Sequence, residues 1–316
     1  MQHTTSDFIL AIHDASMYLS PAEFHRWALK EIRQYIDFDF AIWGGGNGQS
    51  RQLHMATVLD QVDTFFETWE SIKHEDPYAD LVIGNTGKTW SIEELPGFRH
   101  SQAYSEHWGR YCARQMVSTM EVDPQTGLHI FVTLARENQQ CPFNELEARV
   151  KNMITQHLFL ASRHNDMHYL RANQAPAAFV DQRGLFHASL PEFCALLVTE
   201  WGRQASQRLP EAVNHALWQT GRYQSRHISL NAQQFNNRLL VRAAMTPSAI
   251  LSPREEEIAW MYAEGNSHKQ VAQALAISPT TVRTHLARIY QKLNISDKGS
   301  LAIWLKENQD TAVLWC

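Results

Sequence analysis

Hydrophobic residues near the C-terminus recur every three or four positions, a spacing that predicts amphipathic helices. The first of these helices is expected to begin after Ser252 and to end at Gly265, a residue type that commonly closes helices. Ser252 and Glu255 have the spacing of a capping box, and Pro253 stands where a missing N–H costs nothing. The apolar side chains that this helix would bury are Ile258, Met261 and Tyr262.

Three further helices are predicted behind the first one. They cover about 267–275, 279–293 and the segment after Ser296, and the turn 276–278 separates the first two. Ser278 is placed to cap the middle helix, with Pro279 at its first position. The expected core side chains are Val271, Ala272, Leu275, Val282, Leu286, Ile289, Leu293 and Leu301. The pattern predicts an all-α domain of four helices with a helix-turn-helix at its centre.

The charge of the helix predicted over 279–293 indicates a polyanion as its possible partner. The whole chain has a formal net charge of −5, which excludes general electrostatic binding to a polyanion. Residues 279–293 nevertheless contain Arg283, Arg288 and Lys292 and no carboxylate. A basic helix inside a helix-turn-helix is typical of major-groove recognition, in which the N-terminal half of the helix meets base edges.

The segments 251–258, 263–265, 278–285 and 292–293 together resemble the LuxR/NarL-type helix-turn-helix. The resemblance implies that Arg283, Thr284 and Ala287 face the bases. It places Lys269, Thr280, Thr281, Arg288 and Lys292 toward the DNA backbone, and Ser278 and His285 complete the expected DNA-binding set. Ala287 departs from the long, often basic residue that many members have at this step, so recognition there is expected to use a thymine methyl or DNA shape.

The remainder of the chain has strand-like patterns and glycine-containing turns. Residues 38–43 and 53–58 flank a glycine cluster, and residues 116–122 and 129–135 flank a second turn, so each pair predicts a hairpin. Helices are expected at 6–18, 21–36 and 61–72, and a long one from 144. The predicted fold is an antiparallel sheet flanked by helices, of the GAF/PAS type, followed by the LuxR-type domain. The expected domains are a GAF-like ligand-sensing domain over 1–175, a possible small PAS-like unit over 176–246, and the DNA-binding domain over 247–316.

Large aromatic residues in the first region suggest an apolar pocket. Asp76-Pro77 followed by Trp90 is loosely similar to the signal-binding domain of quorum-sensing LuxR regulators, in which the aspartate bonds the amide of the ligand and the tryptophan meets its lactone. Asp63 and Glu67 stand where that family has a tryptophan and a tyrosine, which is a departure. The candidate ligand-binding residues are Phe40, Trp43, Phe66, Trp69, Asp76, Trp90 and Trp108.

These features favour a ligand-responsive, one-component transcription regulator. Its expected partners are operator DNA, an unidentified small effector, a second copy of the chain and, for an activator, RNA polymerase. No apolar run is long enough to cross a membrane and no signal-peptide pattern is present, so a cytoplasmic location is expected. The dimer is expected to use helix 144–172 and the last helix, with Trp304.

Other classes of protein are less favoured. The alternatives are a phosphorylation-driven response regulator and a receptor for acyl-homoserine lactone, both of which would use the same DNA-binding module. No enzyme motif and no phosphate-binding loop stands out. The four cysteines are scattered, and His164 and His168 indicate no third ligand, so neither a metal site nor a cofactor is expected.

Overall fold

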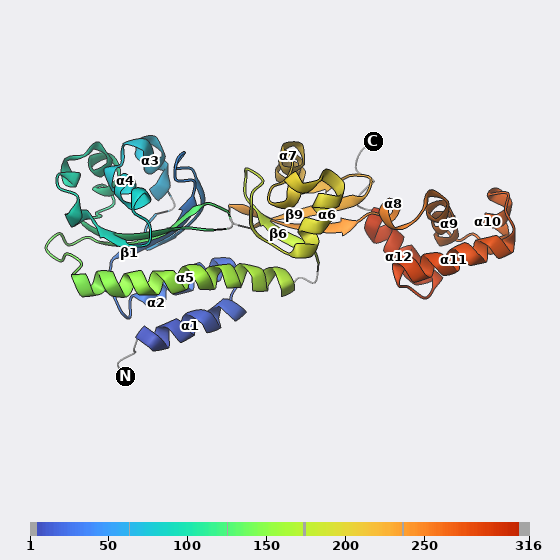
Figure 1. Ribbon diagram of the computed structural model, residues 1–316, viewed down its shortest axis with the longest axis horizontal. Helices are drawn as coiled ribbons and strands as arrows, with labels where there is room; N and C mark the ends of the chain where they lie inside the picture. The colour runs from blue at the N-terminus through green and yellow to red at the C-terminus, as the bar shows by residue number, and fades with distance from the viewer. Residues whose placement is uncertain (1–4, 63, 125, 173–174, 236, 310–316) are drawn as a thin grey trace. The chain divides into compact units, whose positions relative to one another are not determined.

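The computed structural model describes residues 5–62, 64–124, 126–172, 175–235 and 237–309 (Figure 1). The chain divides into two compact units. One consists of residues 1–174, 179–189 and 234–239, and the other of residues 175–178, 190–233 and 240–316. Within the described ranges, no helix is long and apolar enough to cross a membrane.

The N-terminal region contains a five-stranded sheet of order β2-β1-β5-β4-β3. The strands are β1 (Phe40–Gly46), β2 (Leu53–Leu59), β3 (Thr89–Ser91), β4 (Gln115–Val122) and β5 (His129–Arg136). All neighbouring strands are antiparallel, and both predicted hairpins are present as β1–β2 and β4–β5. The antiparallel sheet confirms the predicted fold class and differs from the parallel sheet of a receiver domain.

Helices pack on both faces of this sheet (Figure 1). On one side lie α1 (Thr5–Tyr18), α2 (Pro21–Ile32) and the long α5 (Glu145–Ala172), and on the other α3 (Phe65–Ile72) and α4 (Pro77–Gly84). Short helical turns complete the second side at Lys73–Glu75, Ile92–Glu94, Phe98–His100 and Tyr104–Trp108. Alternate residues of a strand point to opposite faces, so Ala41 and Trp43 join the core under α2 and α5, while Phe40 and Ile42 join the other core.

A second sheet follows, of order β7-β6-β10-β9-β8. Its strands are β6 (Ala177–Val180), β7 (Phe186–Ser189), β8 (Arg222–Gln224), β9 (Ile228–Phe235) and β10 (Arg238–Met245). The helices of this segment are α6 (Pro191–Trp201), a short turn at Arg203–Ser206, and α7 (Glu211–Thr220). Helix α6 ends at Trp201 because Gly202 leaves the helical conformation at φ 83°.

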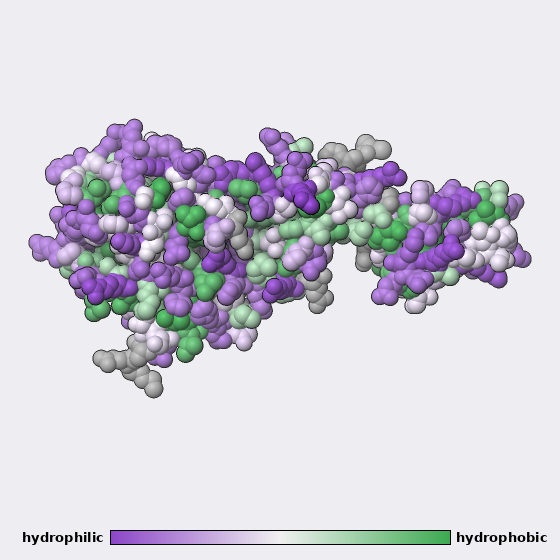
Figure 2. All heavy atoms as spheres, in the orientation of Figure 1, coloured by the Kyte–Doolittle hydropathy of each residue, from purple (hydrophilic) through white to green (hydrophobic). Residues whose placement is uncertain are grey.

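The C-terminal helices are α8 (Pro247–Ile250), α9 (Pro253–Ala263), α10 (His268–Ala274), α11 (Pro279–Leu293) and α12 (Lys298–Gln309). The capping box predicted at the start of α9 is present, since Glu255 N–H donates to Ser252 Oγ and Ser252 N–H donates to Glu255 Oε2 at 2.8 Å. Their shared core contains Leu251, Ile258, Ala259, Val271, Ala272, Val282, Leu286, Ile289, Leu301 and Leu305. Hydrophilic residues cover much of the visible outer surface of these helices (Figure 2).

Candidate DNA-binding surface and ligand cavity

Helix α11 is held in place by its buried stripe and by its N-cap. Val282, Leu286 and Ile289 are buried against the other helices, at the spacing that keeps them on one face. Ser278 Oγ accepts the N–H of Thr281 at 3.0 Å and so fixes the first turn. The opposite face is therefore turned outward, and its exposed residues include Thr280, Arg283, Thr284, Ala287 and Arg288.

This outward face is basic. Within the described part of the chain, the guanidinium groups of Arg283 and Arg288 have no ion-pair partner, and α11 itself contains no carboxylate. Lys269, on α10, is also exposed. Free cationic groups on an exposed helix are the groups that can meet DNA phosphates and guanine edges.

Other predicted DNA-binding side chains make contacts inside the domain. Thr281 Oγ1 lies 2.8 Å from Ser278 Oγ, and Thr284 Oγ1 donates to the carbonyl of Thr280 at 3.1 Å. His285 is half-buried, and its Nδ1 has no hydrogen-bond partner among the described residues. Lys292 Nζ donates to Glu255 Oε2 at 2.5 Å. Burial acts to raise the pKa of Glu255, but hydrogen bonds from Lys292 and Ser252 outweigh it and lower the pKa to about 2.

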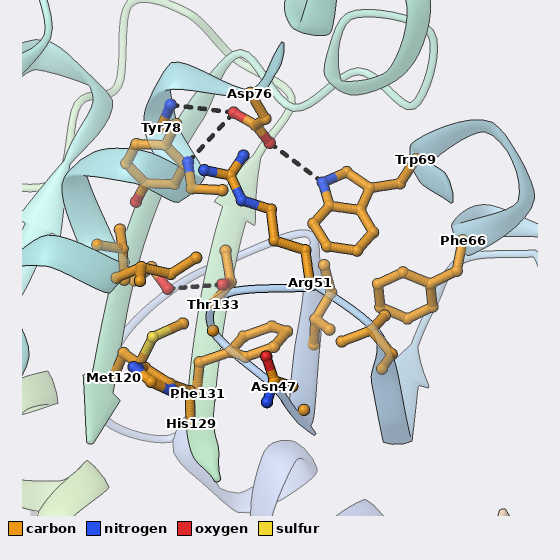
Figure 3. Close-up of a pocket in the computed structure, with 18 of the residues that line it drawn as sticks. Asn47, Arg51, Phe66, Trp69, Asp76, Tyr78, Met120, His129, Phe131 and Thr133 are labelled. Carbon is orange, nitrogen blue, oxygen red and sulfur yellow. Dashed lines mark hydrogen bonds between the residues drawn. The ribbon is translucent and has the colours of Figure 1, made fainter. Parts of the chain in front are cut away.

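A cavity of about 70 Å³ lies in the N-terminal region, between the sheet and the side that carries α3 and α4. Its walls are mainly apolar, and Figure 3 shows the rings of Phe66, Trp69 and Phe131 around the same space. Its polar lining includes Ser118 and Thr133, whose hydroxyls lie 2.8 Å apart on neighbouring strands. Apolar walls with a few convergent polar groups are typical of small-molecule sites.

Asp76 is fully engaged at the edge of this cavity. Its Oδ1 accepts the N–H groups of Tyr78 and Ala79, which makes it the N-cap of α4. Its Oδ2 accepts the indole N–H of Trp69 at 3.1 Å and that of Trp108 at 2.8 Å. A carboxylate has about four lone-pair positions, and all four are occupied by groups of the protein. Burial raises the pKa of Asp76, and these four hydrogen bonds act in the opposite direction.

The cavity has no unpaired charge among the described residues. Arg51 lines it, but its guanidinium donates to Asp80 and to the carbonyl of Lys73. Burial lowers the pKa of His129, also a lining residue, so its imidazole is neutral near pH 7, and its Nδ1 has no partner in the described structure. Because an unpaired buried charge is costly, this lining suits a neutral ligand.

Two glycines of the β1–β2 segment leave room for two aromatic rings that line the cavity. A Cβ on Gly44 would lie 2.3 Å from Cζ of Phe131, and a Cβ on Gly48 would lie 2.5 Å from Cε1 of His129. The rings of Phe131 and His129 therefore occupy space that only glycine leaves open.

The structure brings together four of the seven predicted ligand-binding residues, namely Phe66, Trp69, Asp76 and Trp108. Trp43 lies on the opposite face of the sheet, and Phe40 packs on Phe65 away from the cavity. Trp90 also lies outside the lining, because its indole donates to the carbonyl of Asn85 at 2.8 Å. Glu67 is exposed, and Asp63 lies outside the described residues.

The lining residues that were not predicted from the sequence include Arg51, Ser118, His129 and Thr133. Alternation along β4 and β5 was the available signal for Ser118 and Thr133, but it needs the strand register to become specific. Among the described residues there is no cluster of metal-ligating side chains. Among the described residues, Cys112, Cys141 and Cys194 form no disulfide, and Cys316 lies outside the described residues.

The order and caps of α9–α12 define a helix-turn-helix domain. Residues 249–305 match the family of bacterial regulatory proteins described as the luxR family. This C-terminal segment is therefore a LuxR-family DNA-binding domain, as the sequence predicted.

Known proteins support this assignment of the C-terminal segment. The chain is 37% identical over 62 residues to the transcriptional regulatory protein LiaR of Bacillus subtilis, a match that covers 20% of this chain and 29% of LiaR. It is 35% identical over 63 residues to the CsgBAC operon transcriptional regulatory protein of Escherichia coli, covering 20% of this chain and 29% of that protein. The chain thus spans less than a third of these curated relatives.

Solved structures with similarity over longer stretches include SdiA of Escherichia coli. Its TM-score is 0.36 at 15% identity, with 96% of this chain and 98% of SdiA covered. The N-acylhomoserine lactone dependent LuxR family factor CepR2 of Burkholderia cenocepacia has a TM-score of 0.39 at 15% identity, with 50% of this chain and 92% of that chain covered.

Proposed function

We propose that this chain is a one-component transcription regulator that binds operator DNA through α11. The observation that carries the proposal is the exposed, carboxylate-free face of α11, on which Arg283 and Arg288 have no ion-pair partner in the described structure. The match of residues 249–305 to the luxR family supports the same conclusion. We assign the chain no catalytic role.

The surface proposed to meet DNA follows from the positions on α10 and α11. Arg283, Thr284 and Ala287 are proposed to face base edges, and Lys269, Thr280 and Arg288 the phosphates. Ser278 and Thr281 support the first turn of the helix, whose N–H groups favour a phosphate. Lys292 contributes less than a free lysine, because Glu255 holds its ammonium group.

Binding is tested by selecting oligonucleotides from a random library with the purified full-length chain and measuring fluorescence anisotropy. We expect a selected site to bind at least a hundredfold more tightly than random duplex at physiological salt. Equal affinity for both duplexes would contradict the proposal.

We further propose that the regulator is a homodimer in the cytoplasm. Selection of a palindromic site would support the dimer. If the regulator is an activator, its protein partner is RNA polymerase.

We further propose that a small neutral effector binds in the cavity beside Trp69 and regulates DNA binding. The paired Arg51, the neutral His129 and the mainly apolar walls support this class of ligand. An acyl-homoserine lactone is less favoured, because its amide would compete with two indoles for Asp76.

The effector hypothesis is tested by thermal shift of the full-length chain with a panel of neutral metabolites and an acyl-homoserine lactone. A true effector raises Tm in proportion to the logarithm of its concentration and changes operator affinity. The Phe131→Trp variant, which should fill the cavity, is expected to lose both responses. A panel that shifts wild type and variant equally would place binding elsewhere.

A further inference from the structure

The outward face of α11 carries two methyl groups close to Arg283. Thr284 is exposed, and its hydroxyl is turned back toward the helix, where it donates to the carbonyl of Thr280 at 3.1 Å. This uses the one O–H proton of Thr284 and leaves its γ-methyl as the apolar group that can meet another molecule. Ala287 is exposed three residues further along the same face and offers its β-methyl.

These two methyl groups are close enough for both to contact one methyl group of a bound molecule. Residues three apart on a helix have Cβ atoms about 5–6 Å from each other, and apolar groups touch at about 4 Å. A single methyl group can therefore contact Thr284 and Ala287 together. In the major groove only thymine presents a methyl group, and cytosine presents an N4 amino group and no methyl.

The charged neighbours indicate how this contact would be oriented. Arg283 lies directly before Thr284, and Arg288 directly after Ala287, and neither guanidinium has an ion-pair partner in the described structure. A free guanidinium can bond O6 and N7 of guanine, or a phosphate. The basic groups bring the helix to DNA, and the two methyls between them can add base selectivity only through an apolar contact.

We propose that Thr284 and Ala287 jointly read the methyl group of one thymine in each half-site, beside a guanine read by Arg283. Thr284 acts here through its γ-methyl, because the one proton of its hydroxyl is donated to the carbonyl of Thr280. The inference rests on the proposed DNA-binding function and adds the chemistry of the base pair that α11 selects.

The test uses the full-length chain and the oligonucleotide that it selects from a random library. Each thymine of that site is replaced singly by deoxyuridine, which removes only the methyl group. Burial of one methyl is worth roughly 0.8 kcal/mol, so one position per half-site should bind about fourfold more weakly. The Thr284→Ser variant keeps a hydroxyl and removes the γ-methyl, and should reduce that preference to below about twofold. Thr199→Ser on α6 makes the same chemical change at an exposed threonine whose hydroxyl also donates to the carbonyl four residues earlier, at 2.9 Å, and should keep the wild-type preference.

The outcomes separate this inference from the function on which it rests. Sequence-specific binding with no preference for thymine over deoxyuridine at any position would overturn the methyl contact. A preference that Thr284→Ser leaves unchanged would overturn its assignment to Thr284. Absence of any sequence-specific binding would instead overturn the proposed function, and the inference with it. Unchanged Tm of both variants shows that the domain is folded.

Discussion

Lys292 on α11 and Glu255 on α9 form an ion pair at 2.5 Å that links the exposed helix to the first helix of its domain. The carboxylate is almost completely buried, with its side chain 6% exposed, while the lysine remains 43% exposed. Glu255 also accepts the N–H of Ser252, so one side chain caps α9 and holds the C-terminal end of α11. The orientation of α11 therefore depends on the ionisation of Glu255.

Acid should weaken the C-terminal domain through this carboxylate. The pKa of Glu255 is lowered from 4.5 to about 2 in the folded protein, so its stabilisation is complete above pH 4.5 and is lost as the pH falls toward 2. We expect Glu255→Gln to lower the stability at pH 7 by on the order of 2 kcal/mol and to flatten the pH dependence between 4.5 and 2. Calorimetry of the domain transition at several pH values measures both effects. The exposed Glu264→Gln variant is the control, and it should behave as wild type.

The two free arginines of α11 should differ in what they contribute. Arg283→Ala should weaken binding to the selected site by roughly 1–3 kcal/mol and relax the preference at one base pair. Arg288→Ala should weaken binding to all duplexes alike and reduce the slope of log K against log salt by about one. Anisotropy titrations at several salt concentrations separate these behaviours. Loss of base preference in Arg288→Ala with an unchanged salt slope would reverse the two assignments.

The turn before α11 contains a strained residue. Ala276 has φ 53°, a left-handed conformation that costs a non-glycine residue roughly 1–2 kcal/mol. We expect Ala276→Gly to raise the stability of the domain by about 0.5–1 kcal/mol without changing its DNA preference. Thermal unfolding provides the measurement. Ala274→Gly, the same change in the last residue of α10, should lower the stability, and a gain in both variants would argue against relief of strain at Ala276.

The floor of the N-terminal cavity should be sensitive to a single added methyl. Gly44→Ala places a Cβ 2.3 Å from the ring of Phe131, so the ring must move, at a cost of roughly 1–3 kcal/mol. Phe131→Leu should recover part of this loss when combined with Gly44→Ala. Gly84→Ala is a matched control, because nothing lies within 4 Å of its added Cβ. Thermal unfolding of the two single variants, the double variant and the control gives the coupling free energy between positions 44 and 131. Additive effects of Gly44→Ala and Phe131→Leu would rule out the clash.

The C-terminal domain was predictable because its signals are local. Structure within one helix is specified by a serine three residues before a glutamate, by a proline at the first helical position and by hydrophobic residues spaced three and four apart. The structure contains all of these features. The two N-terminal hairpins were predictable for the same reason. Helix α7 was not predicted, because its buried residues Val213, Asn214 and Leu217 form a short pattern with a polar member.

The cavity depends on contacts between residues far apart in the sequence. Asp76 meets Trp108 across 32 residues, and Ser118 meets Thr133 only when β4 and β5 have the observed register. Composition can select aromatic residues as candidates, but it cannot tell which face of a strand each one occupies. Trp43 was selected on this basis and Trp90 from the loose similarity to quorum-sensing LuxR regulators, and the structure places both outside the cavity.

For the proposed regulator, a carboxylate-free α11 in a chain of net charge −5 has a consequence for how it approaches DNA. The net charge of −5 opposes approach of the chain as a whole to the phosphate backbone, so we expect the productive approaches to be those led by α11. A surface that neutralises few phosphates releases few counterions, so we expect non-specific residence on DNA to be short. For the proposed regulator we therefore expect a search by brief, repeated landings from solution rather than by long one-dimensional sliding.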